Sequence, residues 1–185
     1  MTYKGHLALG SAFGLLPLIY NENIYFNSSD YAYLFGIIYI YSQLPDIDEP
    51  ESHLSKKFPF FIISPLISLF TRHRGFTHTI WAAFLASLII FLLSSYIGMM
   101  PFEKASLFTQ VAFLSYISHI IGDGFTKGGV RPFYPFIDIK LYFLPSFLRF
   151  QTGSWMEFIY FILFLGIDYL EINYLFNIQT GFFIN

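Results

Sequence analysis

Histidine and aspartate residues occur in four short segments of this 185-residue chain, with a spacing typical of metal ligands. The segments are GH at 5–6, PDID at 45–48, HRGFTH at 73–78 and HIIGD at 119–123. His119 and Asp123 are four positions apart, so they share one helical face if the helix continues through Gly122. Imidazole and carboxylate groups together suit zinc, manganese or iron better than calcium. The candidate ligands are His6, Asp46, Asp48, His73, His78, His119 and Asp123.

The HRGFTH segment combines two histidines with a glycine between them. Gly75 permits a turn that brings His73 back toward His78, and Thr77 is a candidate N-cap for the helix that follows. In PDID, the two aspartates point to the same side if the backbone there is extended. Two arginines in the first of these segments or beside it have guanidinium groups suited to phosphate oxygens. They are Arg72 and Arg74.

The composition indicates that a membrane positions these residues. Apolar residues make up 55% of the chain and charged residues only 12%, about half the roughly 25% of soluble domains. The longest uncharged stretch is 75–102, and as a helix its residues 79–100 span about 33 Å, enough to cross a bilayer core of about 30 Å. Further apolar runs occupy 7–20, 31–45, 105–122 and 154–176.

The run 58–70 is too short to span, and the prolines Pro59 and Pro65 are expected to interrupt its helix. We therefore interpret it as a re-entrant or interfacial segment. Lys and Arg concentrate in 46–74 and 123–151, which predicts that both segments are cytoplasmic. The expected fold is an all-α polytopic membrane protein with an inside N-terminus, a retained first helix and about five crossings.

The chain is expected to form one membrane-embedded domain, 1–185, with the metal motifs in 5–123 and a loop and last helix in 124–185. In this topology the seven candidate ligands lie at the cytoplasmic end. Each of them alone is weak evidence, but ionisable groups that gather at one membrane depth indicate a functional site. His53, in a charged loop, is interpreted as an ordinary loop residue.

Charge and cysteine content exclude several classes of function. The net charge is −2, so no basic surface for nucleic acid is indicated. The chain has no cysteine, which excludes disulfides, thiolate catalysis and cysteine-ligated zinc. The sequence does not determine an oligomeric state.

The four motifs, in this order, resemble the YdjM-like family of inner-membrane metal-dependent hydrolases. The resemblance covers residues 5–123, about two-thirds of the chain. It implies a multi-pass helical protein of the bacterial inner membrane with a metal centre facing the cytoplasm. The family is distantly similar to the zinc-dependent phospholipase C and single-strand nuclease superfamily, which implies an activity on phosphoesters.

The ligand set favours a hydrolytic mechanism, with zinc as the first choice of metal. Seven candidates exceed the needs of one tetrahedral zinc, so they suit two or more ions, or one ion with supporting residues. Asp48 or Asp123 would orient the attacking water, and Arg72 or Arg74 would neutralise charge in the transition state. The depth of the site favours a lipid headgroup in the cytoplasmic leaflet as substrate.

Three alternatives come from other classes of function. A metal or proton transporter would place its ligands near the bilayer midplane, whereas these candidates cluster at one end. A lipid phosphatase that forms a phosphohistidine also carries HxxxD, but Phe113 stands where its arginine is expected. A non-enzymatic membrane protein with a structural metal site or a partner-binding role remains open.

Overall fold

The structure is a computed structural model that describes residues 1–21, 24–71 and 74–180, with side chains up to residue 177. Within these ranges it contains helices and two isolated β-bridges but no strand, so the predicted all-α class is confirmed. The α-helices are α1 (Tyr3–Tyr20), α2 (Ser28–Tyr41), α3 (Phe60–Phe70), α4 (Ile80–Leu92), α5 (Phe102–Gly124) and α6 (Trp155–Thr180). The short elements are the 3₁₀ helices η1 (Leu44–Asp48) and η2 (Phe76–His78) and the π-helical turn η3 (Leu93–Ile97).

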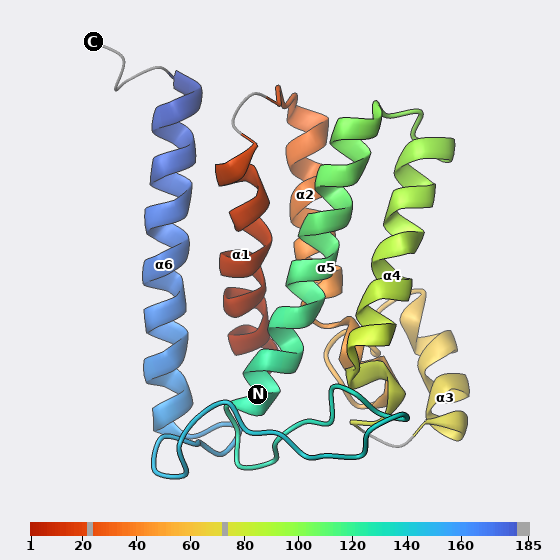
Figure 1. Ribbon diagram of the computed structural model, residues 1–185, viewed down its shortest axis with the longest axis vertical. Coiled ribbons are helices and arrows are strands. Elements are labelled where there is room, and N and C mark those ends of the chain that lie inside the picture. Colours follow the sequence, from red (N-terminus) through yellow and green to blue (C-terminus); the bar gives the residue numbers. More distant parts are fainter. Residues whose placement is uncertain (22–23, 72–73, 181–185) are drawn as a thin grey trace.

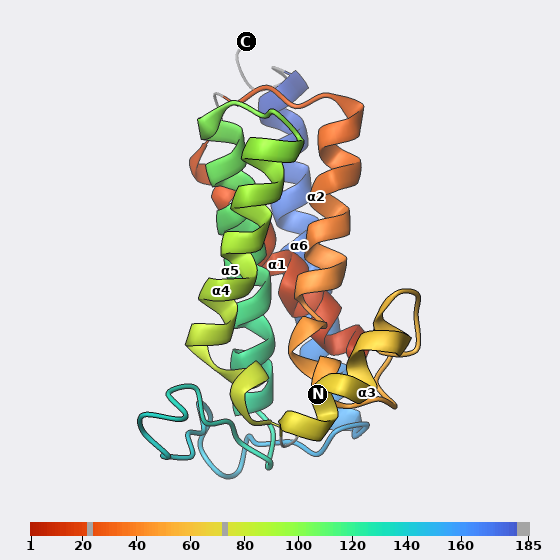
Figure 2. The ribbon, with the colours of Figure 1, turned by 90° about the vertical axis from the view of Figure 1, so that its right-hand side faces the viewer.

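Five helices stand side by side as an elongated bundle, and α3 lies with the longer loops at the end that holds the N-terminus (Figure 1). In the view turned by 90°, α3 projects from the same end (Figure 2). Helix α5 packs against α1, α2 and α4, and α6 packs against α1. The core between these helices includes Leu34, Phe108 and Val111, all of which are buried. Helix α5 is therefore the element around which the bundle is organised.

Two glycines let α1 approach its neighbours closely. A Cβ at Gly10 would lie 2.3 Å from Ser42 Cβ, and one at Gly14 would lie 2.5 Å from Ser115 Oγ. Ser115 Oγ donates a hydrogen bond to the Gly10 carbonyl at 3.2 Å. Small residues at such positions are the usual basis of tight packing between membrane helices. This contact fixes α1 against α5 and so determines where His6 lies.

Three segments in the described part of the chain are long and apolar enough to cross a membrane. They are Ile80–Ile97, Phe102–Gly124 and Trp155–Asn177. Helices α1 and α2, with 18 and 14 residues, are not among them. The five crossings expected from the sequence therefore stay a prediction, while the apolar character of the bundle is established.

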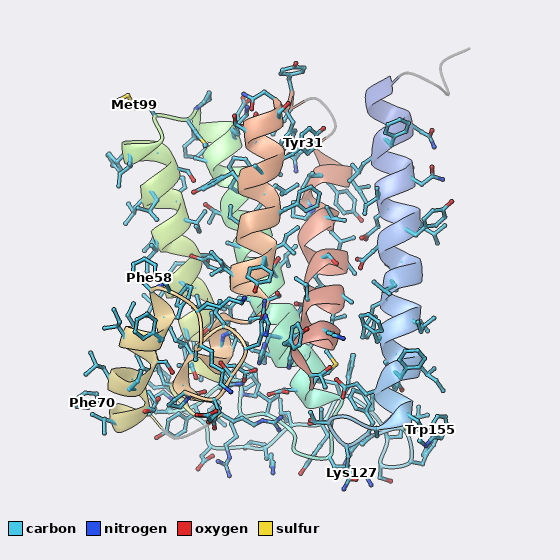
Figure 3. All side chains as sticks on the ribbon, turned by 180° about the vertical axis from the view of Figure 1, so that it is seen from behind. Tyr31, Phe58, Phe70, Met99, Lys127 and Trp155 are labelled. Atoms are coloured by element: carbon cyan, nitrogen blue, oxygen red, sulfur yellow. The ribbon has the colours of Figure 1, made fainter. Side chains whose placement is uncertain are left out.

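Helix α3 differs from expectation at its prolines. It runs without a break from Phe60 to Phe70 with Pro65 inside, and Pro59 is its N-cap. The prediction that both prolines interrupt the helix is therefore wrong. Pro65 removes one backbone donor, and the helix tolerates that single loss. Figure 3 shows Phe58 and Phe70 on the outer side of the molecule near α3, and both are largely exposed.

Candidate metal centre

Helix α5 brings two predicted ligands to its C-terminal end. It continues through Gly122 to Gly124, so His119 and Asp123 share a face as predicted. His119 Nδ1 lies 2.8 Å from the Ser42 carbonyl oxygen, which can only accept a hydrogen bond. Nδ1 is therefore the donor, and in the neutral ring Nε2 presents its lone pair to the centre of the cluster. Nothing in the sequence indicates this role of the Ser42 carbonyl.

Two aspartates flank the ring of His78. Asp46 Oδ1 lies 3.4 Å from Nε2, and Asp48 Oδ2 lies 3.6 Å from Nδ1. Thr77 Oγ1 also donates to Asp48 Oδ2 at 2.7 Å. Asp48 is therefore placed behind the imidazole, as a group that orients it, whereas Asp46 faces the same side as Nε2.

The local backbone in both motifs differs from expectation. Asp46 and Asp48 lie in the 3₁₀ helix η1, so the extended conformation considered for them is wrong. The N-cap of α4 is Thr79, whose side chain accepts from Ala82 N, and the prediction of Thr77 in that role is wrong. The chain makes the extra 3₁₀ turn η2 before α4 begins, and this turn leaves the Thr77 hydroxyl free to bond Asp48.

Four ligand atoms from three elements converge on one point. His78 Nε2 lies 3.5 Å from Asp123 Oδ2, and His119 Nε2 lies 3.5 Å from Asp46 Oδ1 and 4.0 Å from Asp123 Oδ2. Ligands bound to a tetrahedral ion at about 2.1 Å lie about 3.4 Å from each other. The spacing of these four atoms therefore fits one zinc-sized ion with small adjustments.

His6 extends the cluster from α1. Its ring stacks on that of His119 with centroids 3.5 Å apart, and its Nε2 lies 3.4 Å from Asp123 Oδ1. Two groups of three residues have ligand atoms close enough to hold an ion, and they share His119. They are His6, Asp46 and His119, and His78, His119 and Asp123. The arrangement therefore accommodates one ion or two neighbouring ions.

The centre is buried, and its polar atoms are incompletely paired. His6, His78, His119 and Asp123 are each at most 1% exposed. His119 Nε2, Asp123 Oδ2 and both ring nitrogens of His6 make no hydrogen bond with the described residues. Buried polar atoms without a hydrogen bond are costly, so such a group requires an explanation. A bound cation would supply the missing partner for all of them.

Electrostatics favour opposite charges within the cluster. Burial raises the pKa of the Asp46 carboxyl, but His119 and His78 outweigh it and hold this pKa well below its usual range. Burial lowers the pKa of His78, but hydrogen bonds with Asp46 and Asp48 outweigh it and raise this pKa to about 9. The carboxylates are therefore ionised, and a metal that binds His78 must displace a proton.

Of the three residues predicted between 72 and 74, only Arg74 can be placed. Arg72 and His73 lie outside the described residues. Arg74 Nη2 donates to Asp123 Oδ1 at 3.0 Å, and Nη1 donates to the Gly129 carbonyl at 3.1 Å. Asp123 Oδ1 also accepts from the Met1 amino group at 2.8 Å. The sequence contains no signal for either the Gly129 or the Met1 contact.

A cavity of about 410 Å³ leads from the surface to the cluster. Its lining includes Asp46, Asp123 and Arg74, together with Tyr3, Glu49 and His53. The Asp46 side chain is 26% exposed, which makes it the ligand that solvent reaches most easily. His53 stacks on Tyr3 and hydrogen-bonds Tyr39. It belongs to neither group of candidate ligands.

Comparison with known proteins decides the family. A sequence model of the YdjM inner membrane proteins matches residues 1–178, nearly the whole chain. The chain belongs to the YdjM family. It is 32% identical over 136 residues to inner membrane protein YdjM of Escherichia coli (strain K12) and to that of Shigella flexneri. These alignments cover 73% of this chain and 66% of each relative, just under two thirds of the relative's length.

No solved structure matches the chain of this YdjM family member. The family resemblance inferred from the four motifs is confirmed, because the family model includes all of them. The relatives' name and the apolar helices of the bundle support a location in the inner membrane. The buried cluster of histidines and aspartates lies in this family setting.

Proposed function

We propose that this YdjM family member is a metal-dependent hydrolase embedded in the inner membrane, with its centre at the cytoplasmic face. The observation that carries the proposal is the convergence of His78 Nε2, His119 Nε2, Asp46 Oδ1 and Asp123 Oδ2 at spacings that fit a tetrahedral ion. Zinc is the metal of choice, because the ligands are imidazole and carboxylate and none is a thiolate.

The orientation follows from the basic residues. The segment between α2 and α4 and the segment between α5 and α6 lie at the same end of the bundle as the N-terminus (Figure 1). Both are rich in Lys and Arg, whereas the opposite end carries Lys104. A bias of this kind marks the cytoplasmic side. Five crossings, with α3 at the interface, satisfy this orientation.

Hydrolysis would use the chain's residues in separate roles. A bound divalent ion supplies an activated water at neutral pH and polarises the oxygen of the scissile group. Asp46 is the carboxylate closest to solvent, so it is placed to accept a proton from a molecule in the cavity. Asp48 and Thr77 fix the ring of His78, and the Ser42 carbonyl fixes that of His119.

A phosphoester at the membrane surface is the substrate class that we propose. The cavity that reaches Asp46 and Asp123 lies at the end of the bundle where lipid headgroups would be found in this orientation. The exposed aromatic side chains Phe58, Phe70 and Trp155 are at the same end (Figure 3). Aromatic side chains at that level anchor a protein among headgroups. A phospholipid headgroup is therefore within reach without leaving the bilayer.

The first test is the metal content of protein purified in detergent. We expect at least one zinc per wild-type chain and a large loss in His78→Ala and Asp123→Ala, measured by mass spectrometry at equal folded yield. His53→Gln is the matched control, because His53 lies near the cavity but outside both ligand groups. Folded wild type that is metal-free, and takes up neither zinc nor manganese on titration, would overturn the proposal.

A structural metal site is the second candidate function. The specific observation in its favour is that four ligand atoms already surround the point of convergence, and structural zinc sites are closed in this way. The two candidates differ in what metal removal does. A structural ion raises the melting temperature and supports no turnover, whereas the hydrolase cleaves a phosphoester from a panel of phospholipids and nucleotides only when loaded.

A further inference from the structure

Asp123 uses its two carboxylate oxygens differently. Oδ2 faces His78 and His119 and makes no hydrogen bond with the described residues. Oδ1 faces the other way, where it accepts from Arg74 at 3.0 Å and lies 3.4 Å from His6 Nε2. The carboxylate is therefore held by one oxygen while the other is presented to the candidate metal position.

Arg74 reaches Asp123 from an unusual backbone conformation. Its φ is +60°, in the left-handed region that residues other than glycine rarely adopt. Such a conformation persists only where the surroundings stabilise it, and it is found most often at functional sites. Here two hydrogen bonds fix the guanidinium, one to Asp123 and one to the Gly129 carbonyl.

The space that the guanidinium occupies exists because residue 128 is glycine. A Cβ at Gly128 would lie 2.0 Å from Arg74 Nη1 and 3.1 Å from Cζ. The turn that carries Gly128 follows α5 directly: Thr126 Oγ1 donates to the Asp123 carbonyl at 2.7 Å and accepts from Gly128 N at 3.2 Å. The same short segment therefore carries the carboxylate and the seat for the arginine that holds it.

We propose that Arg74 is a positioning residue for Asp123, and that Gly128 is required so that the guanidinium can enter. The inference rests on the proposed metal centre and assigns a role that the transition-state function expected from the sequence does not include. By binding Oδ1, Arg74 fixes the rotation of the carboxylate and compensates part of its charge, so that Oδ2 points at the ion. Groups that orient metal ligands typically contribute about 10- to 100-fold to metal affinity.

The test compares zinc affinity in four proteins: wild type, Arg74→Ala, Gly128→Ala and the double variant. We expect each single substitution to weaken zinc binding about 10- to 100-fold. We expect the double variant to be no weaker than Arg74→Ala alone, because both changes remove the same contact. Gly128 has no positive φ, so the added methyl group meets the guanidinium and requires no backbone strain.

Two controls separate this contact from general effects on charge and folding. Lys127→Ala removes a positive charge from the exposed residue next to Gly128, and Gly36→Ala adds a methyl group where nothing lies within 4 Å. Both should bind zinc as wild type does. Arg74→Lys should recover part of the affinity lost in Arg74→Ala, because an ammonium group reaches one of the two acceptors.

Cobalt gives a readout that a purely structural role would not change. The visible absorption of bound Co²⁺ depends on its ligand geometry, so a misdirected Asp123 alters the spectrum in Gly128→Ala at saturating metal. A loss of folded protein alone would lower the intensity and keep the shape. Variants that bind zinc as tightly as wild type, with unchanged spectra, would overturn the role of Arg74; wild type without metal would overturn the centre itself.

Discussion

The rings of His6 and His119 lie nearly parallel, 3.5 Å apart and 5° from coplanar, although they come from the first and fifth helices. Gly122 makes this approach possible, since a Cβ there would lie 3.3 Å from His6 Nδ1 and 2.8 Å from the Met1 side chain. The stack places the α1 ligand directly beside the α5 ligands. It also makes His119 the residue common to both candidate ligand groups.

The shared position of His119 predicts unequal effects of removing the two histidines. His119→Ala removes one ligand from both groups, so we expect metal binding to be lost. His6→Ala leaves His78, His119 and Asp123 in place, so we expect it to retain a weaker or smaller complement of metal. Metal content after equilibration with zinc measures both. Equal losses in the two variants would contradict the two overlapping groups.

Metal binding should also depend on pH. The pKa of His78 is raised to about 9 because the stabilising contacts with Asp46 and Asp48 outweigh burial, so the metal-free ring is protonated at pH 7. Zinc binds the neutral ring, so binding at pH 7 should release about one proton from His78, and affinity should rise between pH 7 and 9. Calorimetry in buffers with different ionisation enthalpies measures the proton release. Equal affinity at pH 7 and pH 9 would show that the ring is already neutral.

The close approach of α1 to its neighbours predicts a strong dependence on two glycines. Gly10→Ala and Gly14→Ala should each destabilise the bundle by about 1–3 kcal/mol, because the new methyl groups meet Ser42 and Ser115. Gly36→Ala is the matched control in α2, where no atom lies within 4 Å. Thermal unfolding in detergent, followed by circular dichroism, compares the three. A midpoint for Gly10→Ala as high as that of the control would contradict the packing described here.

An ion pair joins α2 and α5 at the end of the bundle opposite the candidate metal centre. Lys104 Nζ lies 2.7 Å from Asp30 Oδ2, and both side chains are mostly buried. Lys104→Met leaves the carboxylate without its partner and should cost about 3 kcal/mol. Asp30→Asn combined with Lys104→Met should recover much of that loss. Denaturant or thermal unfolding of the two variants tests this, and an equally unstable double variant would argue against a paired charge.

Much of the fold follows from the sequence because helix-length apolar runs specify themselves. The runs at 7–20, 105–122 and 154–176 all lie inside observed helices, and α5 carries HIIGD on one face as its spacing requires. The clustering of His6, Asp46, His78, His119 and Asp123 also follows from placing the motifs at one membrane depth. Periodicity and depth are properties that a single sequence contains.

The details of the site depend on contacts between distant segments. The 3₁₀ turns that contain Asp48 and Thr77 form where these residues bond each other, and neither motif alone specifies that partner. The fixed orientation of His119 depends on a backbone carbonyl, which every residue possesses. Arg74 has a positive φ that no local pattern would predict, since Gly75 beside it is the residue expected to take it. Tertiary hydrogen bonds therefore set the geometry, whereas sequence sets the inventory.

The packing of α6 against α1 bears on the order in which the protein is made. Every candidate ligand in the described part of the chain precedes residue 125, and α6 follows after a loop of about thirty residues. Chains are synthesised from the N-terminus, and early segments begin to assemble before later ones emerge. The first five helices thus hold all that the centre requires when α6 is still in the ribosome, and α6 joins a unit that is already built.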